Sequence, residues 1–218
     1  MVGAGEKVRR TGEVTAAHNM RGLESDGHSE KIVRIDCGGY FLRTVTSEDA
    51  SNRWAGWMSE PKNLRLLNSA PKAMTRDDVA AYIKRFDQRS HLLIGVFEKR
   101  SGLHIGFFRL DIDHRLKRCL MFLLIGEQKY RHWRVTDDIR GPFQDYIFDE
   151  LGLNTILATV LESNQAMIRY MLKSGWSFDR RSERHVKSQT AGTMLDLCFL
   201  SLSREAWQAW KKKNLPQH

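Results

Sequence analysis

The sequence is poor in the residues that build metal centres and disulfide scaffolds. Its 218 residues include three cysteines, Cys37, Cys119 and Cys198, far apart and with no CxxC pair or histidine at metal-ligand spacing. This excludes a zinc-finger or disulfide-rich class, and we expect no metal site. Because Cys119 and Cys198 fall inside apolar runs, we predict that both are buried thiols.

Long apolar segments are also missing. The longest apolar run, Cys119 to Ile125, is far shorter than the roughly 20 residues that a membrane helix needs. Residues 2–31 are polar, glycine-rich and charged, without the hydrophobic stretch of a signal peptide. We therefore expect no membrane partner and a cytoplasmic location.

Basic charge is in excess, but the motifs of a nucleic-acid-binding protein are absent. The formal net charge is +9. Residues 1–30 carry four basic and five acidic side chains, whereas residues 176–218 carry eight basic and four acidic ones, including the cluster Lys211–Lys213. No zinc finger, recognition helix or RNP-like aromatic pattern accompanies these charges. A basic surface around an anionic small ligand explains them at least as well, so nucleic acid is not the expected partner.

Apolar patterning divides the chain into a tail and one domain. Residues 1–30 have no apolar periodicity and contain five glycines, so we predict a mobile polar tail, followed by a single domain over residues 31–218. Apolar alternation and short apolar runs predict strands over 32–36, 40–45, 91–98, 103–111, 119–125, 155–161 and 194–202. Helical spacing predicts helices that begin at Ser47 and after the capping sequence Thr75–Asp78, and others over about 138–151, 165–174 and 204–213.

The lengths of the connections predict the sheet topology. Short turns join strands 91–98, 103–111 and 119–125, which makes them antiparallel neighbours. A helix separates strand 119–125 from strand 155–161, so that pair is expected to be parallel. The sequence thus predicts an α/β (α+β) fold with a mixed central sheet flanked by helices.

Three motifs stand in an order known from one family. LESN at 161–164 and KSGW at 173–176 look like the "E-S/T-N … K-x-G-F" segment of GNAT acyltransferases, with the family's eleven residues from Asn to Gly. YFLR at 40–43 followed by SEDA at 47–50 looks like the family's "L-R … T-x-E-D-A" opening. The chain therefore resembles the GNAT (GCN5-related) N-acetyltransferase family over roughly residues 40–202, nearest the ribosomal-protein N-terminal acetyltransferase branch.

The resemblance implies the GNAT acyl-CoA N-acyltransferase fold and acetyl-CoA, or another acyl-CoA, as co-substrate. In this fold the pantetheine arm lies along the end of a strand, and the pyrophosphate lies at the start of the next helix. The residues implied to bind it are Leu124, Ile125, Gly126, Arg131, His132, Trp133, Arg134, Val135, Thr136, Asn164 and Lys173.

The pyrophosphate loop is degenerate. Arg134 and Thr136 replace the glycines of the family's Q/R-x-x-G-x-G/A loop, and two aspartates follow them. Pro142 lies about six residues into the helix expected after this loop, so either the helix starts late, with Pro142 at its first position, or it is kinked. Side-chain charge from Arg131, His132, Arg134 and Arg140 would then replace the backbone contacts.

Amide formation from a thioester needs a base for the amine, a donor for the developing oxyanion and a proton for the thiolate. Glu127 is the first candidate base and Asp111 the second. A backbone N–H within residues 123–125 is the candidate oxyanion donor. The family's acid positions are occupied by Met167 and Met171, which leaves Tyr170 as the nearby phenol.

We therefore expect an enzyme, an N-acyltransferase that moves an acetyl or other acyl group from acyl-CoA to a primary amine of a small molecule or protein. Two alternatives stay open. Acyl-carrier protein as donor would present only phosphopantetheine, and its acidic surface would meet Arg131 and Arg134. A non-catalytic GNAT-fold binding or regulatory module would not need the missing acid residues.

Overall fold

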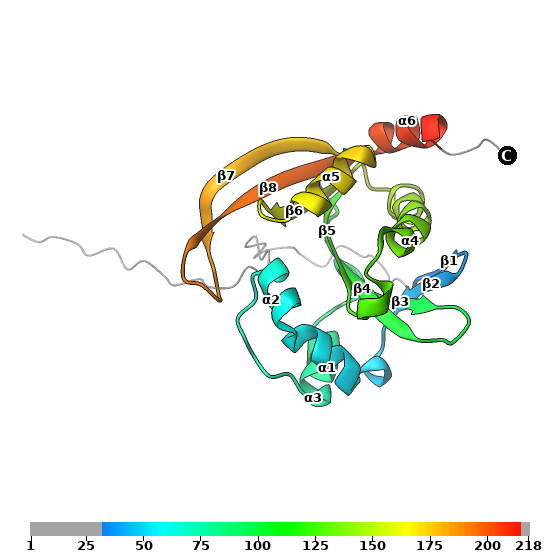
Figure 1. Ribbon diagram of the computed structural model, residues 1–218. Coiled ribbons are helices and arrows are strands. Elements are labelled where there is room, and N and C mark those ends of the chain that lie inside the picture. Colours follow the sequence, from blue (N-terminus) through cyan, green and yellow to red (C-terminus); the bar gives the residue numbers. More distant parts are fainter. Residues whose placement is uncertain (1–31, 215–218) are drawn as a thin grey trace, which may run out of the picture.

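The computed structural model describes residues 32–214 and contains a mixed eight-stranded sheet (Figure 1). The predicted tail, residues 1–30, lies outside the described residues. The strands follow the spatial order β1-β2-β3-β4-β5-β6-β8-β7. Their bounds are β1 Arg34–Cys37, β2 Tyr40–Thr44, β3 His91–Glu98, β4 His104–Asp113, β5 Arg118–Ile125, β6 Thr155–Leu161, β7 Ser177–Lys187 and β8 Met194–Ser203.

Most helices form where caps and apolar spacing predict them, with corrections at several ends, whereas the helix Pro61–Leu67 was not predicted. Their bounds are α1 Asn52–Ser59, α2 Pro61–Leu67, α3 Arg76–Ile83, α4 Trp133–Asp145, α5 Gln165–Lys173 and α6 Arg204–Asn214. The capping box of Thr75 and Asp78 at the start of α3 is confirmed. The helix predicted from Ser47 is instead a short 3-10 turn followed by α1, because the Ser51 side chain caps Trp54 and starts a new helix there.

The expected start of the helix after β5 was wrong. α4 begins at Trp133 and runs through Pro142, so Pro142 does not occupy its first position. Proline has no N–H for the carbonyl four residues earlier. A π-helical turn, Tyr146–Glu150, follows α4 and completes this helical segment.

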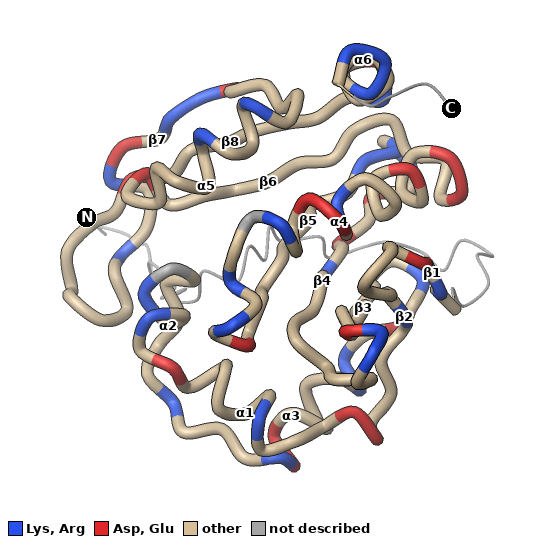
Figure 2. The backbone as a smooth tube through the Cα atoms, turned by 45° about the vertical axis from the view of Figure 1, so that its right-hand side comes forward, with Lys and Arg blue, Asp and Glu red and all other residues tan. Residues whose placement is uncertain are grey.

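Strand β7 was not predicted, and its position explains why. It is the outermost strand of the sheet, and nearly all of its residues are exposed. Charged residues of both signs run along it (Figure 2). Apolar alternation requires one buried face, which an exposed edge strand does not have.

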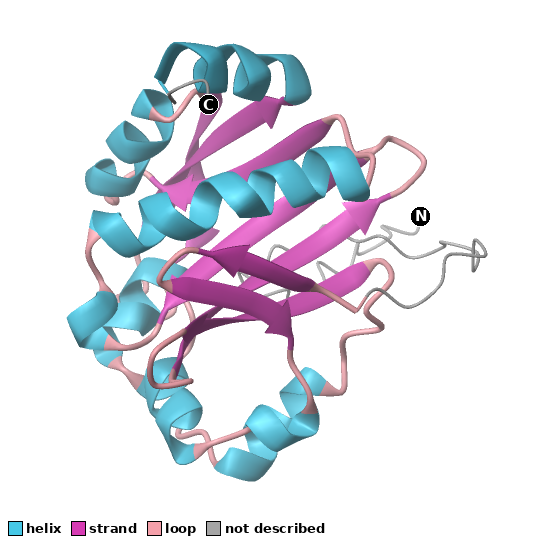
Figure 3. Cartoon of the chain, turned by 90° about the vertical axis from the view of Figure 1, so that its right-hand side faces the viewer, coloured by secondary structure: helices cyan, strands magenta, loops and turns pink. Residues whose placement is uncertain are grey.

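Helices cover both faces of the sheet (Figure 3). On one face α4, α5 and α6 pack over a core that includes Phe108, Ile139 and Trp207. On the other face α1 and α3 pack over Phe107 and Leu124. The three cysteines are buried free thiols, which confirms the prediction for Cys119 and Cys198. Within residues 32–214 no helix is long and apolar enough to cross a membrane.

Candidate functional site

The parallel pair β5–β6 separates soon after it begins. Only Arg118–Leu120 of β5 pair with Thr155–Leu157 of β6. Beyond this point β5 pairs with β4 alone, and β6 pairs with β8 alone. The inner edges of both strands, from residues 121 and 158 onward, are therefore open between the two halves of the sheet.

The register of β5 identifies the backbone groups on its open edge. The N–H of Gly126 donates to the carbonyl of Ile105 at 2.9 Å, which places this pair in the hydrogen-bonded set of the β4–β5 ladder. Hydrogen-bonded and non-bonded pairs alternate along antiparallel strands. The N–H and C=O groups of Met121, Leu123 and Ile125 therefore point away from β4, toward the separation. Two of these residues lie in the segment predicted to supply the oxyanion donor.

Two helices begin at the same end of the separation. Parallel strands end on the same side of a sheet, so β5 and β6 lead into α4 and α5 there. His132 precedes α4 without a side-chain cap, and the N–H group of Arg134 has no acceptor among the described residues. Basic positions gather along the segment from β5 into α4, with acidic positions following in the helix (Figure 2). Uncapped N–H groups and basic side chains favour an anion at this point.

Arg131 holds the turn between β5 and α4. Its Nε donates to the carbonyl of Ile125 at 3.0 Å, and one Nη donates to the carbonyl of Gly126 at 2.5 Å. Both Nη atoms also contact the carboxylate of Glu60, at the start of α2. These hydrogen bonds hold the pKa of Glu60 below its ordinary value. Most donors of Arg131 are thus already bonded within the protein, not turned toward an anion.

The residues at the family's glycine positions lie in the first turn of α4. Neither Arg134 nor Thr136 has a positive φ, so the backbone conformation here does not require glycine. Arg134 is exposed, and Val135 is buried in the core. Asp137 accepts a hydrogen bond from the hydroxyl of Tyr170 at 2.7 Å.

Glu127 is held beside the end of β5 by helix α1. Its Oε1 accepts from the indole Nε1 of Trp57 at 3.1 Å and lies 3.6 Å from Nε of Arg53. The Glu127 side chain is 22% exposed, so it is reachable from solvent. Gly126 makes the arrangement possible, because a Cβ there would lie 2.0 Å from the indole ring of Trp57. The first candidate base therefore has a fixed position and one oxygen, Oε2, without a recorded partner among the described residues.

Asn164 and Lys173 lie at opposite ends of α5. The Asn164 side chain accepts from the N–H of Met167 at 3.3 Å, so its role as an N-cap is confirmed. It follows the open end of β6 and lies beside the separation. Lys173 is nine residues further along the helix, about 13 Å away at 1.5 Å per residue. The structure does not bring Lys173 to the same place as Asn164.

Tyr170 lies where α5 packs against α4. Besides its hydrogen bond to Asp137, its ring lies 5.8 Å from the Arg140 guanidinium. Burial raises the pKa of Tyr170 above its ordinary value, so the phenol stays protonated at neutral pH. Its proton is directed toward Asp137 and not toward β5.

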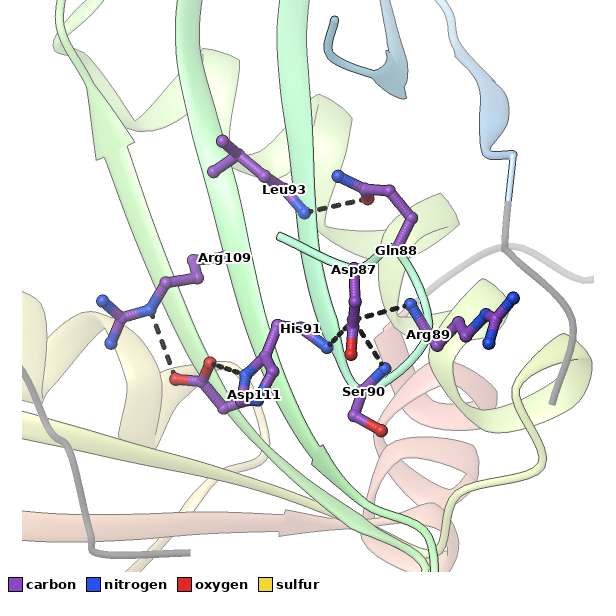
Figure 4. A network of polar contacts seen from close by, with 8 residues as sticks. All are labelled: Asp87, Gln88, Arg89, Ser90, His91, Leu93, Arg109 and Asp111. Atoms are coloured by element: carbon purple, nitrogen blue, oxygen red, sulfur yellow. Dashed lines mark hydrogen bonds and ion pairs between the residues drawn. The ribbon is translucent and has the colours of Figure 1, made fainter. Parts of the chain in front are cut away.

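Asp111 forms part of a polar network on the α1/α3 face of the sheet (Figure 4). Its Oδ1 lies 2.9 Å from Nδ1 of His91, and its Oδ2 lies 3.3 Å from Nε of Arg109. The hydrogen bond to Asp111 raises the pKa of His91. Nearby, Asp87 accepts the backbone N–H groups of residues 89–91 and fixes the turn before β3. Both oxygens of the second candidate base are therefore engaged, one with His91 and one with Arg109.

Several residues that shape the site were not singled out from the sequence. These are Arg53, Trp57, Glu60, His91 and Arg109. For Arg109 a signal existed: it stands two residues before Asp111 in a largely apolar strand, which places both polar side chains on one face. The others depend on contacts between distant segments, for which the sequence carried no local signal.

Comparison with known proteins agrees with this architecture. Residues 40–177 match the family described as "Acetyltransferase (GNAT) domain". No curated protein matches the sequence. In the part of the chain that the structure describes, no group of three or more histidine, cysteine or acidic side chains could hold a metal ion.

Solved structures share the fold at low sequence identity. A GCN5-related N-acetyltransferase from Brucella melitensis has a TM-score of 0.69 at 18% identity, over 84% of this chain and 83% of that one. Ribosomal-protein-S5-alanine acetyltransferase from Vibrio fischeri has a TM-score of 0.68 at 14% identity, over 80% and 98%. Spermidine N-acetyltransferase from Vibrio cholerae, solved with CoA and spermine, has a TM-score of 0.69 at 14% identity, over 78% and 98%.

Proposed function

Because the chain belongs to the acetyltransferase (GNAT) family, we propose that it transfers an acetyl or similar acyl group from acyl-CoA to a primary amine. The observation that carries the proposal is the open edge of β5, which ends at the uncapped start of α4. An extended pantetheine arm can pair with such an edge as an added strand, and a pyrophosphate matches the N-terminus of a helix.

The residues divide the chemistry as follows. The amine nitrogen attacks the thioester carbonyl carbon, so the N–C bond forms and the carbonyl oxygen becomes an oxyanion. When this intermediate collapses, the C=O bond is restored and the C–S bond breaks. The N–H of Leu123 or Ile125, on the open edge, donates to the oxyanion. Glu127 accepts the proton that the amine loses, and its position is fixed by Trp57. The thiolate leaves without a dedicated acid and takes its proton from solvent or from a group of the protein.

The charges at α4 take different roles in this proposal. Arg131 shapes the turn through the two carbonyls and Glu60, while Arg134 supplies the cation for the pyrophosphate. Two facts support the choice of Arg134: it is exposed, and it has no salt-bridge partner in residues 32–214. Asn164 would contact the pantetheine arm in addition to capping α5.

The experiment is calorimetric titration with coenzyme A at about 50 mM and about 500 mM salt, a range over which screening of exposed charges becomes strong. We expect binding that weakens at high salt. Arg134→Gln should weaken it by about tenfold or more, the loss of one charge-assisted contact of roughly 1.5–3 kcal/mol. Arg115→Gln, an exposed arginine in the turn between β4 and β5, is the matched control and should bind like the wild type.

Three results would change the proposal. Absence of heat at both salt concentrations, with folded protein, would rule out coenzyme A and leave acyl-carrier protein as the donor to test. Tighter binding by Arg134→Gly would mean that Arg134 obstructs the site. Binding of acetyl-CoA without transfer to any amine would favour a binding or regulatory module.

The motifs near residues 40–50 and 161–176 resemble those of ribosomal-protein N-terminal acetyltransferases, and this supports a protein N-terminus as the acceptor amine. We propose a peptide N-terminus as the first acceptor to assay, with a polyamine as the second.

A further inference from the structure

One region of the α1/α3 face of the sheet is only partly buried. On the opposite face Phe108, Leu110 and Ile112 of β4 are at most 2% exposed. On this face the alternate residues Arg109 and Asp111, and Phe122 of β5, are only partly buried. The helices α1 and α3 pack over Phe107 and Leu124, and Tyr82 of α3 reaches Arg109, but Arg109, Asp111 and Phe122 each keep part of their surface exposed. These three side chains are the part of this face next to β5 that solvent reaches.

Arg109 lies on the floor of this region with unused hydrogen-bonding capacity. Its side chain is 16% exposed, and its one salt bridge, to Asp111, is made through Nε. The two terminal nitrogens point away from Asp111 (Figure 4). The Tyr82 hydroxyl lies within hydrogen-bonding reach of the guanidinium, and the ring of Phe122 lies 5.7 Å from its central carbon. The carboxylate of Asp111 also contacts His91, so Arg109 is not its only partner.

Arg109 lies near the backbone groups proposed to contact the thioester. Arg109 stands opposite Phe122 in the β4–β5 ladder. The candidate oxyanion donors, the N–H groups of Leu123 and Ile125, are one and three residues further along β5. At about 3.3 Å per residue, they lie roughly 3–10 Å along the strand from Arg109. An acceptor amine at the thioester carbonyl would place its neighbouring groups over the guanidinium.

We propose that Arg109 forms a carboxylate subsite for the acceptor, so that the preferred acceptor is an amine carrying a carboxylate a few bonds away, as in an amino acid or a short acidic peptide. This inference rests on the proposed acyl transfer. A guanidinium is a planar fork that matches a carboxylate through two parallel hydrogen bonds, and partial burial strengthens them. The same charge repels a polyamine at this position.

The test is an NMR titration with glutarate as the carboxylate probe and glutaramide as its uncharged match. Glutarate should shift the backbone amide signals of Arg109 and Phe122, and glutaramide should not. Arg109→Gln should weaken glutarate binding by about tenfold or more, while the Arg115→Gln control keeps it. Equal glutarate binding by wild type and a folded Arg109→Gln would overturn the proposal, as would equal binding of the two probes.

Two more variants keep the test decisive if Arg109→Gln fails to fold. Arg109→Lys keeps the charge but not the fork and should bind glutarate more weakly than the wild type. Asp111→Asn removes the competing carboxylate and should bind it more tightly; weaker binding would count against the subsite. Acetyl-CoA titration of the same proteins separates the two proposals. Binding of glutarate without binding of acetyl-CoA would support the carboxylate subsite but exclude acyl-CoA as the donor. Binding of acetyl-CoA without binding of glutarate would exclude the subsite and leave the proposed acyl transfer intact.

Discussion

At the scale of single residues, the site uses side chains whose partners fix their direction. Glu127 is oriented by Trp57, and Arg131 by two carbonyls and Glu60. Asn164 differs, because its side-chain oxygen already caps α5 while it also lies at the open end of β6. Capping by itself explains why an asparagine stands here. Variants that keep the cap but change the side chain are therefore needed to test its proposed contact with the pantetheine arm.

Asn164→Asp and Asn164→Ser should keep the cap, with the free energy of unfolding changed by less than about 1 kcal/mol, yet weaken coenzyme A binding. Asn164→Ala should lose both the cap, about 1 kcal/mol, and the contact. Chemical denaturation and calorimetry on the three variants measure the two effects. If Asp and Ser bind coenzyme A like the wild type while Ala loses stability alone, Asn164 is a cap and nothing more.

At the scale of elements, the end of β5 and helix α1 form one unit. Gly126 leaves space for the indole ring of Trp57, whose N–H then reaches Glu127. The ring also packs edge-on against His104, 5.1 Å away, and burial lowers the pKa of His104 to about 4. This histidine is neutral at physiological pH and acts here as an aromatic packing partner. A change at Gly126 should therefore reach the candidate base through Trp57.

Gly126→Ala should reduce acyl transfer and destabilise the protein by roughly 1–3 kcal/mol, because its Cβ would overlap the Trp57 ring. Gly141→Ala is the matched control. No atom lies within 4 Å of the Cβ it would add, and alanine in a helix interior should stabilise α4 by up to about 1 kcal/mol. Thermal unfolding and transfer assays on both variants test this. A Gly126→Ala protein that unfolds and turns over like the wild type would show that Trp57 moves without consequence.

The elements were predicted correctly where the sequence carries a local pattern. Strands β3, β4 and β5 were found as apolar runs between turns, and the start of α3 was found from its capping box. Strand β7 was missed because it buries no face, and α2 because it has only seven residues. The start of α4 was predicted too late, because Arg134 and Thr136 were compared with the glycines of the family's loop and Pro142 was taken as a helix breaker. The chain is already helical at these positions.

At the scale of the whole molecule, the long β7–β8 hairpin reaches helix α2 (Figure 1). Asn68, at the end of α2, donates to the carbonyl of Lys187 and accepts from the N–H of Gln189, both at 2.9 Å. Its backbone is left-handed, with φ of 47°, and its side chain is buried. Asn68 therefore links helix α2 to the β7–β8 hairpin, on the far side of the separation between β5 and β6.

Asn68→Gly should keep the left-handed backbone but lose both side-chain hydrogen bonds, at a cost of about 1–3 kcal/mol. Amide exchange of Gln189 should become faster. Lys117→Gly is the control, since Lys117 has the same φ of 47° with an exposed side chain and should lose no stability. Hydrogen exchange with denaturation distinguishes them. Unchanged protection at Gln189 in Asn68→Gly would mean that other contacts hold the hairpin.

The sequence by itself determined the mixed sheet, the antiparallel pairs β3–β4 and β4–β5, the parallel pair β5–β6, the buried thiols of Cys119 and Cys198, and the family. These follow from apolar runs, connection length and local motifs. The tertiary structure alone decided what the motifs contact. The Arg131–Glu60 pair spans 71 positions and the Asn68–Lys187 contact 119, separations at which a sequence carries no periodic signal. The tertiary structure also decided which backbone groups of β5 are unpaired, because this depends on the residue at which β6 separates from β5. Side-chain chemistry is encoded locally, whereas the direction in which each group points is set by packing between distant segments.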